Sequence, residues 1–254
     1  MHRSPYRTRD RAAGRSQRSA FTRARKLEAR YAAQLRRIAR HVGEIVEAFP
    51  PGDPEALPRL DAALQRYAET IRPWAEAVGQ RMVSEIAARD ERAWMQASRE
   101  MAAELRREIR TAPTGQAMRE ALAEQVKLIT SLPTEAAERV HRLTLEGIEN
   151  ASRASEIAKE IMRSGEVTES RANLIARTEV GRVSTELTKA RAKHIGSTGY
   201  IWRTAGDSDV RDSHRRMAGK FVAWDDPPTL DGLTGHAGAL PNCRCYPEPV
   251  IPEE

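Results

Sequence analysis

The 254-residue sequence has little of what would indicate a secreted or membrane protein. It contains only two cysteines, Cys243 and Cys245, and aromatic residues make up 5% of the chain. A bridge between cysteines two residues apart closes a tight ring with unfavourable geometry, so we expect the thiols to stay reduced or to bind a metal. No apolar run reaches the roughly eighteen residues that span a bilayer. The basic N-terminus also lacks the apolar segment of a secretory signal.

The composition favours helix over sheet. Charged residues make up 31% of the chain, and Ala, Arg, Glu and Leu dominate it. This balance is typical of long, solvent-exposed helices. We therefore predict a mainly α protein, with an elongated helical body and a small C-terminal α+β module.

The positive charge is concentrated at the N-terminus. The first forty residues hold thirteen basic and two acidic side chains, a net charge of +11 within a chain total of +6. A basic end on a mildly acidic body is typical of a protein that touches a polyanion, and a solvated, disordered leader has the same composition. Arginines spread among Ser, Thr and Gly can clamp phosphate without reading bases. The candidate nucleic-acid-binding residues are Arg3, Arg7, Arg9, Arg11, Arg15, Arg18, Arg23, Arg25 and Lys26.

Apolar periodicity predicts two long helical regions after this basic arm. From Ala20 to Phe49 apolar residues recur at every third or fourth position, and the prolines between 50 and 54 end the pattern. A second region covers 53–110, with Pro73 as a candidate break. Its tryptophans and methionines fall at helical spacing, which predicts packing residues rather than a cofactor site.

The second half of the chain is expected to hold shorter elements. Pro133 predicts the start of a helix, Gly165 a helix end and Thr168 an N-cap. The expected helices are 116–130, 133–148, 154–163 and 168–195. Alternating residues predict short strands at 200–204, 220–224 and 244–250. The expected organisation is a disordered basic arm (1–18), a helical body (19–163) and a C-terminal module (164–254).

The C-terminal module holds the residues that carry chemistry. His214, His236, Cys243 and Cys245 form a donor set that can close a tetrahedral zinc site. One structural zinc would supply folding free energy to strands that have few large apolar residues of their own. The alternative is that His214 is a surface or hydrogen-bonding histidine and that the cysteines are ordinary core residues.

A catalytic interpretation uses overlapping residues. A loop-rich module with these side chains is loosely similar to a metal-dependent nuclease, and the basic arm would then hold DNA near the site. Ligation of zinc by both histidines, however, leaves neither of them as a general base. The module also has no nucleophile beside a base and no phosphate-binding glycine loop. The residues that this interpretation uses are Asp209, Asp212, His214, His236 and Asn242.

The last ninety residues resemble the phage Mu F-like minor head proteins, also called phage head morphogenesis proteins. The resemblance is carried by 165–172, 174–180, 200–202, 209–214, 219–221, 224–228 and the Pro-Asn-Cys-Arg-Cys run at 241–245. One departure is His236-Ala237, where the family pattern leads us to expect a histidine–proline pair.

The resemblance implies a minor structural protein of a tailed-phage or prophage head, and not an enzyme. Its implied partners are the portal protein and the major capsid or scaffold proteins, with a role in DNA packaging or delivery as a further expectation. Its implied location is the virion head, and the host cytoplasm during assembly. We expect no membrane anchor, and non-specific DNA contact through the N-terminal arm.

Overall fold

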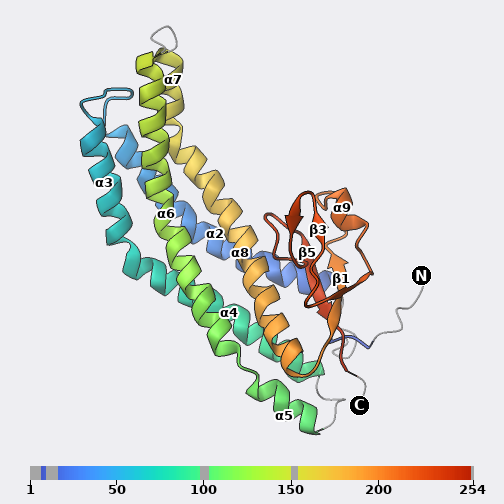
Figure 1. Cartoon of the computed structure of the whole chain (residues 1–254). Coiled ribbons are helices and arrows are strands. Elements are labelled where there is room, and N and C mark those ends of the chain that lie inside the picture. The colour runs from blue at the N-terminus through green and yellow to red at the C-terminus, as the bar shows by residue number, and fades with distance from the viewer. Residues whose placement is uncertain (1–6, 10–16, 98–102, 150–153, 253–254) are drawn as a thin grey trace. The chain divides into compact units, whose positions relative to one another are not determined.

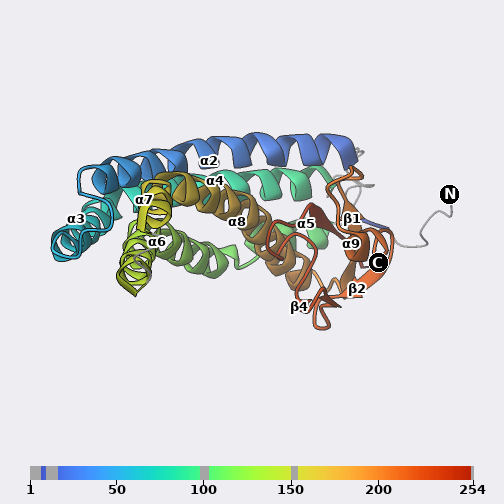
Figure 2. The ribbon, with the colours of Figure 1, turned by 90° about the horizontal axis from the view of Figure 1, so that it is seen from above.

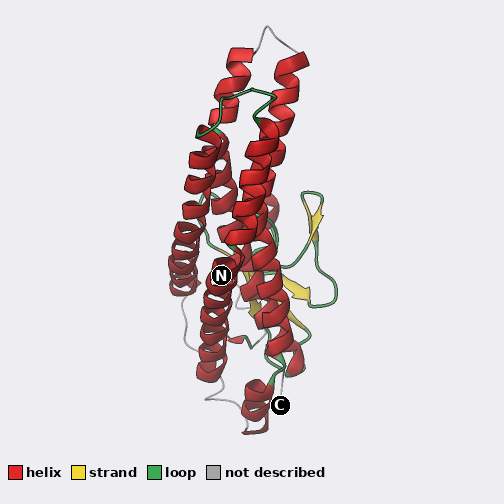
Figure 3. Ribbon diagram, turned by 90° about the vertical axis from the view of Figure 1, so that its left-hand side faces the viewer, coloured by secondary structure: helices red, strands yellow, loops and turns green. Residues whose placement is uncertain are grey.

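Helices make up most of the protein, as the composition predicts. The computed structural model describes residues 7–9, 17–97, 103–149 and 154–252 (Figure 1). Its helices are α2 (Gln17–Glu47), α3 (Leu57–Thr70), α4 (Arg72–Ala97), α5 (Ala103–Thr111), α6 (Thr114–Glu149), α7 (Ala154–Met162), α8 (Ser164–His194) and α9 (Asp212–Arg215). The strands are β1 (Gly199–Thr204), β2 (Phe221–Ala223), β3 (Thr229–Leu230), β4 (Leu233–Thr234) and β5 (Cys245–Pro249). All of these strands follow α8. Helices dominate the ribbon and the strands are few and short (Figure 3), so the predicted mainly α class with a small C-terminal strand module is confirmed.

The chain forms two compact units whose segments alternate along the sequence. Unit 1 comprises residues 1–28, 81–121 and 177–254, and unit 2 comprises 29–80 and 122–176. The long helices α2, α4, α6 and α8 each contribute to both units. This organisation differs from the consecutive body and module expected from the sequence. Within the described residues, no helix is both long and apolar enough to cross a membrane.

Unit 2 is a helical bundle with a core of aliphatic side chains. Its fully buried residues include Leu35, Leu64, Ile129, Leu132 and Ile161. Two glycines let α2 and α8 approach closely, because a Cβ atom added to Gly165 would lie 3.0 Å from the Cα atom of Gly43. The predicted end of the helix 154–163 is confirmed, since α7 ends at Met162, but Gly165 is not its cap: it lies in the first turn of α8 and serves helix packing.

Helix α6 continues through the break predicted at Pro133. It runs unbroken from Thr114 to Glu149 with the proline inside. Hydroxyl groups next to the proline bond to helix carbonyls: Ser131 donates to Leu128 O at 3.0 Å, and Thr134 donates to Ser131 O at 3.0 Å. Packing of the apolar face therefore outweighs the cost of the missing backbone N–H group.

Thr168 lies inside α8 rather than at its start. The helix begins at Ser164, and the Thr168 hydroxyl donates to Ser164 O at 2.7 Å. Threonine at this position bonds back to the preceding turn, so the prediction of an N-cap is wrong.

Unit 1 contains a three-stranded antiparallel sheet in the order β2-β1-β5. Strand β1 pairs with both neighbours, with Tyr200 opposite Val222 on one side and Thr204 opposite Cys245 on the other. These strands confirm the predicted positions 200–204, 220–224 and 244–250. Figure 2 shows β1, β2, β4 and α9 of unit 1 gathered together, with α5 of the same unit nearby.

The core of unit 1 joins the sheet to the helices. Trp202 and Trp224 are fully buried and belong to one apolar cluster with Trp94 of α4 and Ile109 of α5. The sheet therefore has more apolar support than its own residues supply. The prediction that Trp94 is a packing residue is confirmed.

Strands β3 and β4 form a small hairpin that is not among the strands expected from the sequence. Thr229 pairs with Thr234 and Leu230 with Leu233. The two residues between the strands, Asp231 and Gly232, have φ angles of 53° and 79°. Positive φ at both positions is the geometry that an Asp-Gly turn favours.

Residues 7–9 of the predicted disordered arm are packed against unit 1. Thr8 forms a β-bridge with Val250, and Ile251 N donates to Arg7 O at 2.9 Å. Arg9 is 8% exposed and its guanidinium lies over the Trp94 ring. The expectation of disorder over 1–18 therefore fails for these three residues, because polar partners distant in sequence satisfy them. Residues 1–6 and 10–16 of the arm lie outside the described residues.

Candidate metal centre

The two cysteines lie at the start of β5 and in the turn before it. Cys245 is the first residue of the strand and pairs with Thr204 of β1. Cys243 follows a turn in which its N–H group donates to Leu240 O at 3.1 Å, and Asn242 has a φ angle of 56°. In extended backbone, residues two apart point to the same side. The Cys-x-Cys spacing therefore presents both thiols in one direction.

His214 comes from the short helix α9. Its side chain is buried, with 1% exposure, and its ring meets the Trp202 ring edge-on at 5.6 Å. The helix is closed by bonds from Arg215 N to Arg211 O and from Arg216 N to Asp212 O. Packing on the tryptophan fixes the imidazole in the direction of the cysteines.

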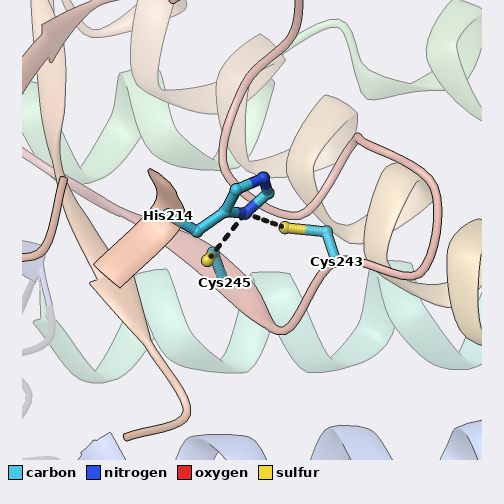
Figure 4. Close-up of side chains that lie close together, drawn as sticks. All are labelled: His214, Cys243 and Cys245. Carbon is cyan, nitrogen blue, oxygen red and sulfur yellow. Dashed lines mark hydrogen bonds between the residues drawn. The ribbon is translucent and has the colours of Figure 1, made fainter. Parts of the chain in front are cut away.

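These three residues converge on one point. His214 Nδ1 lies 3.4 Å from Cys243 Sγ and 3.5 Å from Cys245 Sγ. Figure 4 shows both sulfur atoms directed at the same ring nitrogen. All the potential ligand atoms lie within 4.8 Å of one another. Zinc–sulfur and zinc–nitrogen bonds of about 2.3 and 2.0 Å place sulfur and nitrogen about 3.5 Å apart in a tetrahedron. The cluster has the spacing and the donors to hold a metal ion.

The two thiols have different proton affinities. A hydrogen bond from Cys245, together with one from His214, lowers the pKa of Cys243 to about 5 although burial opposes the change. The same thiol–thiol contact, reinforced by burial, raises the pKa of Cys245. The thiolate is the form of cysteine that binds metal. These opposite shifts favour ionisation of Cys243 before Cys245.

Ion pairs fix the residues between and around the ligands. Arg244, between the two cysteines, donates to Asp207 Oδ1 at 3.1 Å and lies 3.4 Å from Asp209 Oδ2. Arg211 donates to Pro241 O. This bond links the segment before α9 to the loop between β4 and β5, residues 235–244, here called the cysteine loop. These contacts hold both parts of the cluster in position, as outer-shell partners of metal ligands do.

Helix α8 supplies two positioning residues that sequence reasoning missed. Arg177 donates to Asn242 Oδ1 at 2.8 Å, and Asn242 N donates to the Thr178 hydroxyl at 3.0 Å. Together they hold the left-handed Asn242 next to Cys243. No local pattern reveals these contacts, because more than sixty residues separate the partners.

A close approach of backbones seats the cysteine loop on α8. A Cβ atom added to Gly181 would lie 2.5 Å from Gly238 O. Gly238 itself has a φ angle of 90°, a conformation that L side chains rarely adopt. Both positions therefore require glycine.

His236 occupies a separate position. Its Nδ1 lies 3.3 Å from the Tyr200 hydroxyl and its Nε2 lies 3.1 Å from Lys189 Nζ. Burial and the nearby Lys189 charge lower the pKa of His236 to about 4, so the ring is neutral near pH 7. The described cluster comprises the other three predicted ligands, and His236 is not a member of it. It packs edge-on against the rings of Tyr200 and Trp224.

The polar residues of the catalytic interpretation are each engaged with other side chains. Asp209 contacts Arg244, Asp212 lies 3.7 Å from Arg215, and Asn242 is held by α8. His214 faces the cysteines. These contacts hold the loops around the cluster.

The predicted nucleic-acid-binding residues fall into different environments. Arg9 is buried and its Nη1 lies 3.0 Å from Asp90 Oδ1. Arg25 and Lys26 are exposed on α2. Arg18 and Arg23 lie within α2. The backbone carbonyl of Arg7 accepts a hydrogen bond from Ile251 N. The predicted residues that lie outside the described residues are Arg3, Arg11 and Arg15.

Fold and site together define a mainly helical protein with a histidine–cysteine cluster in a small strand module. Residues 138–247 match the family described as Phage Mu protein F like protein. The chain therefore contains a Mu F-like region, and the resemblance that the motifs indicated is confirmed. The matched residues begin within α6 and include α7, α8 and all three candidate ligands.

A protein of Haemophilus influenzae strain Rd, described as an uncharacterized protein, is 31% identical over 129 residues. The aligned part covers 51% of this chain and 28% of that relative. The chain thus spans less than a third of the relative's length. No solved structure matches the chain.

Proposed function

We propose that the protein is a minor structural protein of a tailed-phage head that associates with the portal and procapsid during head morphogenesis. The match of residues 138–247 to the Mu F-like family carries this proposal. The expected setting is a phage or prophage, with the protein in the virion head and, during assembly, in the host cytoplasm. The expected partners are the portal protein and the major capsid or scaffold proteins.

Exposed apolar side chains of unit 2 support a protein partner. They lie on α6, α7 and the first part of α8, and a partner that covered them would remove this apolar surface from water. The residues are Leu145, Ile148, Met162, Val167 and Leu174. Ile148 is the most exposed of them, at 55%.

Site-specific cross-linking tests the head role. A photoreactive residue at Ile148 should cross-link to portal or capsid protein in particles assembled from the phage's own head genes. The matched position Glu120, also exposed on α6, should cross-link less. Absence of the protein from purified heads, identified by mass spectrometry, would overturn the proposal.

We also propose that the cluster holds one structural zinc through His214, Cys243 and Cys245. The matching spacing and the lowered pKa of Cys243 support this assignment. A structural zinc takes four ligands, so a fourth donor completes the site. His236 is the fourth ligand predicted from the sequence. If it turns toward the cluster and becomes the fourth ligand when zinc binds, replacing it should lower the zinc content; if it does not, the zinc content should stay the same.

The basic start of the chain is proposed to contact DNA through phosphates. Exposed Arg25 and Lys26 support this role, whereas the buried Arg9 is engaged with Asp90. The double variant Arg25→Ala/Lys26→Ala should lower the slope of log binding constant against log salt by about 0.9 for each lost duplex contact. The variant Arg59→Ala should leave the slope unchanged, since that residue is exposed on α3. If Arg25→Ala/Lys26→Ala has the same slope as Arg59→Ala, the phosphate role is refuted.

The three donors at His214 fit a structural metal site, and we favour an assembly role over catalysis. The rival hypothesis of a metal-dependent nuclease predicts cleavage of DNA by the pure protein. That cleavage should disappear with His214→Ala while circular dichroism shows an intact fold. We expect no cleavage by either protein.

A further inference from the structure

A pocket of about 200 Å³ lies beside the cysteine loop in unit 1. Its walls come from the start of α2, the middle of α4, one face of α8 and residues 243–247. Binding pockets for drug-sized ligands run from about 300 to 1,000 Å³. The volume here suits a smaller group.

The lining of the pocket is strongly basic. Its arginines are Arg9, Arg25, Arg89, Arg92, Arg177 and Arg244. Among the described lining residues only Glu28 and Asp90 carry carboxylates, a formal excess of four positive charges, which falls to two when Asp207 and Asp209, the partners of Arg244, are counted. Both carboxylates are themselves paired, Glu28 with Arg177 at 3.1 Å and Asp90 with Arg9 at 3.0 Å. The potential inside the pocket therefore favours an anion.

The remaining lining is partly apolar and partly hydroxyl-bearing. Ile86, Ala93 and Val180 supply an aliphatic wall, and the exposed Ser184 lies on the α8 side. Guanidinium groups match the tetrahedral oxygens of phosphate through paired N–H donors. An aliphatic wall can contact a sugar ring attached to that phosphate. The chemistry fits one phosphate with its neighbouring sugar better than a segment of acidic protein.

We propose that this pocket binds a phosphate group carried by nucleic acid or by a free nucleotide. The site shares Arg9 and Arg25 with the basic start of the chain, but α4, α8 and residues 243–247 supply most of its lining. It goes beyond the proposed assembly role and does not depend on it. A protein that never enters a phage head would still show this binding.

Two variants separate the pocket from the arm. Ser184→Phe fills the pocket without changing charge, and Ser170→Phe, exposed on the same helix, is its control. Arg92→Ala removes one lining charge, and Arg59→Ala on α3 is its control. Because none of the four positions belongs to the arm, any DNA binding by the arm stays the same throughout.

The probes are a short fluorescent single-stranded oligonucleotide and a nucleoside monophosphate, measured with the full-length protein. Ser184→Phe should weaken binding several-fold, and Arg92→Ala should lower the salt slope for the oligonucleotide by about 0.7. If only oligonucleotide binding is weakened by the pocket substitutions, the phosphate that the pocket binds belongs to nucleic acid. If only binding of the monophosphate is weakened, that phosphate belongs to a free nucleotide. Either result supports the site.

Two results would overturn it. The first is binding of both probes by Ser184→Phe and Arg92→Ala at the level of their controls. The second is displacement of the oligonucleotide by polyglutamate at equal charge concentration as effectively as by unlabelled oligonucleotide, which would assign the pocket to an acidic protein segment.

Discussion

Asp90 is the buried carboxylate on which three segments of unit 1 meet. Its side chain is 3% exposed. It accepts hydrogen bonds from Arg9 at 3.0 Å, Thr188 at 2.7 Å and Arg191 at 3.2 Å. Replacing it with alanine leaves two buried guanidinium groups without this carboxylate.

The expected cost follows from that loss. Removing one partner from a buried ion pair lowers the free energy of unfolding by about 3–5 kcal/mol. For a chain of this size each kcal/mol corresponds to about 2–4 °C in Tm, so Asp90→Ala should lower Tm by about 6–20 °C. Asp90→Asn keeps the shape and much of the hydrogen bonding of the side chain without its charge. Its Tm should therefore lie between those of the wild type and Asp90→Ala.

Differential scanning calorimetry of full-length protein measures the effect, with the exposed Asp61→Ala as the control. Proteolysis should also become faster near residues 7–9 in the Asp90 variant, since Arg9 loses its anchor. A Tm for Asp90→Ala equal to that of Asp61→Ala would show that the buried ion pairs do not form, and the reasoning would fail.

Three further predictions concern the cluster and the loop that carries it. Chelation should lower Tm by about 8–16 °C if free zinc exceeds Kd about a thousandfold, which corresponds to about 4 kcal/mol, and should have no effect on His214→Ala. The depressed pKa of His236, about 4 against its ordinary 6.5, means that the unfolded chain binds more protons between these values. Stability should therefore fall as pH drops from 6.5 to 4, and His236→Asn should flatten that dependence in denaturant titrations. Gly181→Ala should lower the free energy of unfolding by about 1–3 kcal/mol because its methyl group meets a backbone carbonyl, whereas Gly115→Ala, near only a flexible arginine side chain, should not destabilise the protein.

Much of the helical framework can be read from the sequence. The apolar period of 20–49 predicts α2, observed at Gln17–Glu47, within three residues at each end. Strand β1 likewise follows from the alternation at 200–204. Local periodicity is a sufficient signal where one face of an element is buried.

Local signals fail where distant residues decide the conformation. Pro133 and Thr168 carry helix-boundary signals, yet both lie inside helices, because packing of the long α6 and α8 faces overrides them. Arg9 has the composition of a solvated arm, yet it is buried against residues of α4 and α8 far along the chain. The Asp231-Gly232 turn, in contrast, is a local signal for a hairpin that could have been recognised.

The candidate site was partly predictable. The cysteine spacing and the presence of histidine upstream identify three residues that the structure brings together. Sequence spacing could not show that His236 turns toward Tyr200 and Lys189 instead. Nor could it show that Trp94 and Ile109 complete the core beneath the sheet.

The most direct test of the metal assignment is native mass spectrometry of the full-length protein beside its Cys243→Ser/Cys245→Ser variant. The full chain is needed because α4 and α5 contribute to the core under the cluster. The account predicts about one zinc ion per wild-type chain and none in the variant. A well-folded wild-type chain that takes up no metal even with zinc in excess would contradict it, and the cysteines would then be core residues.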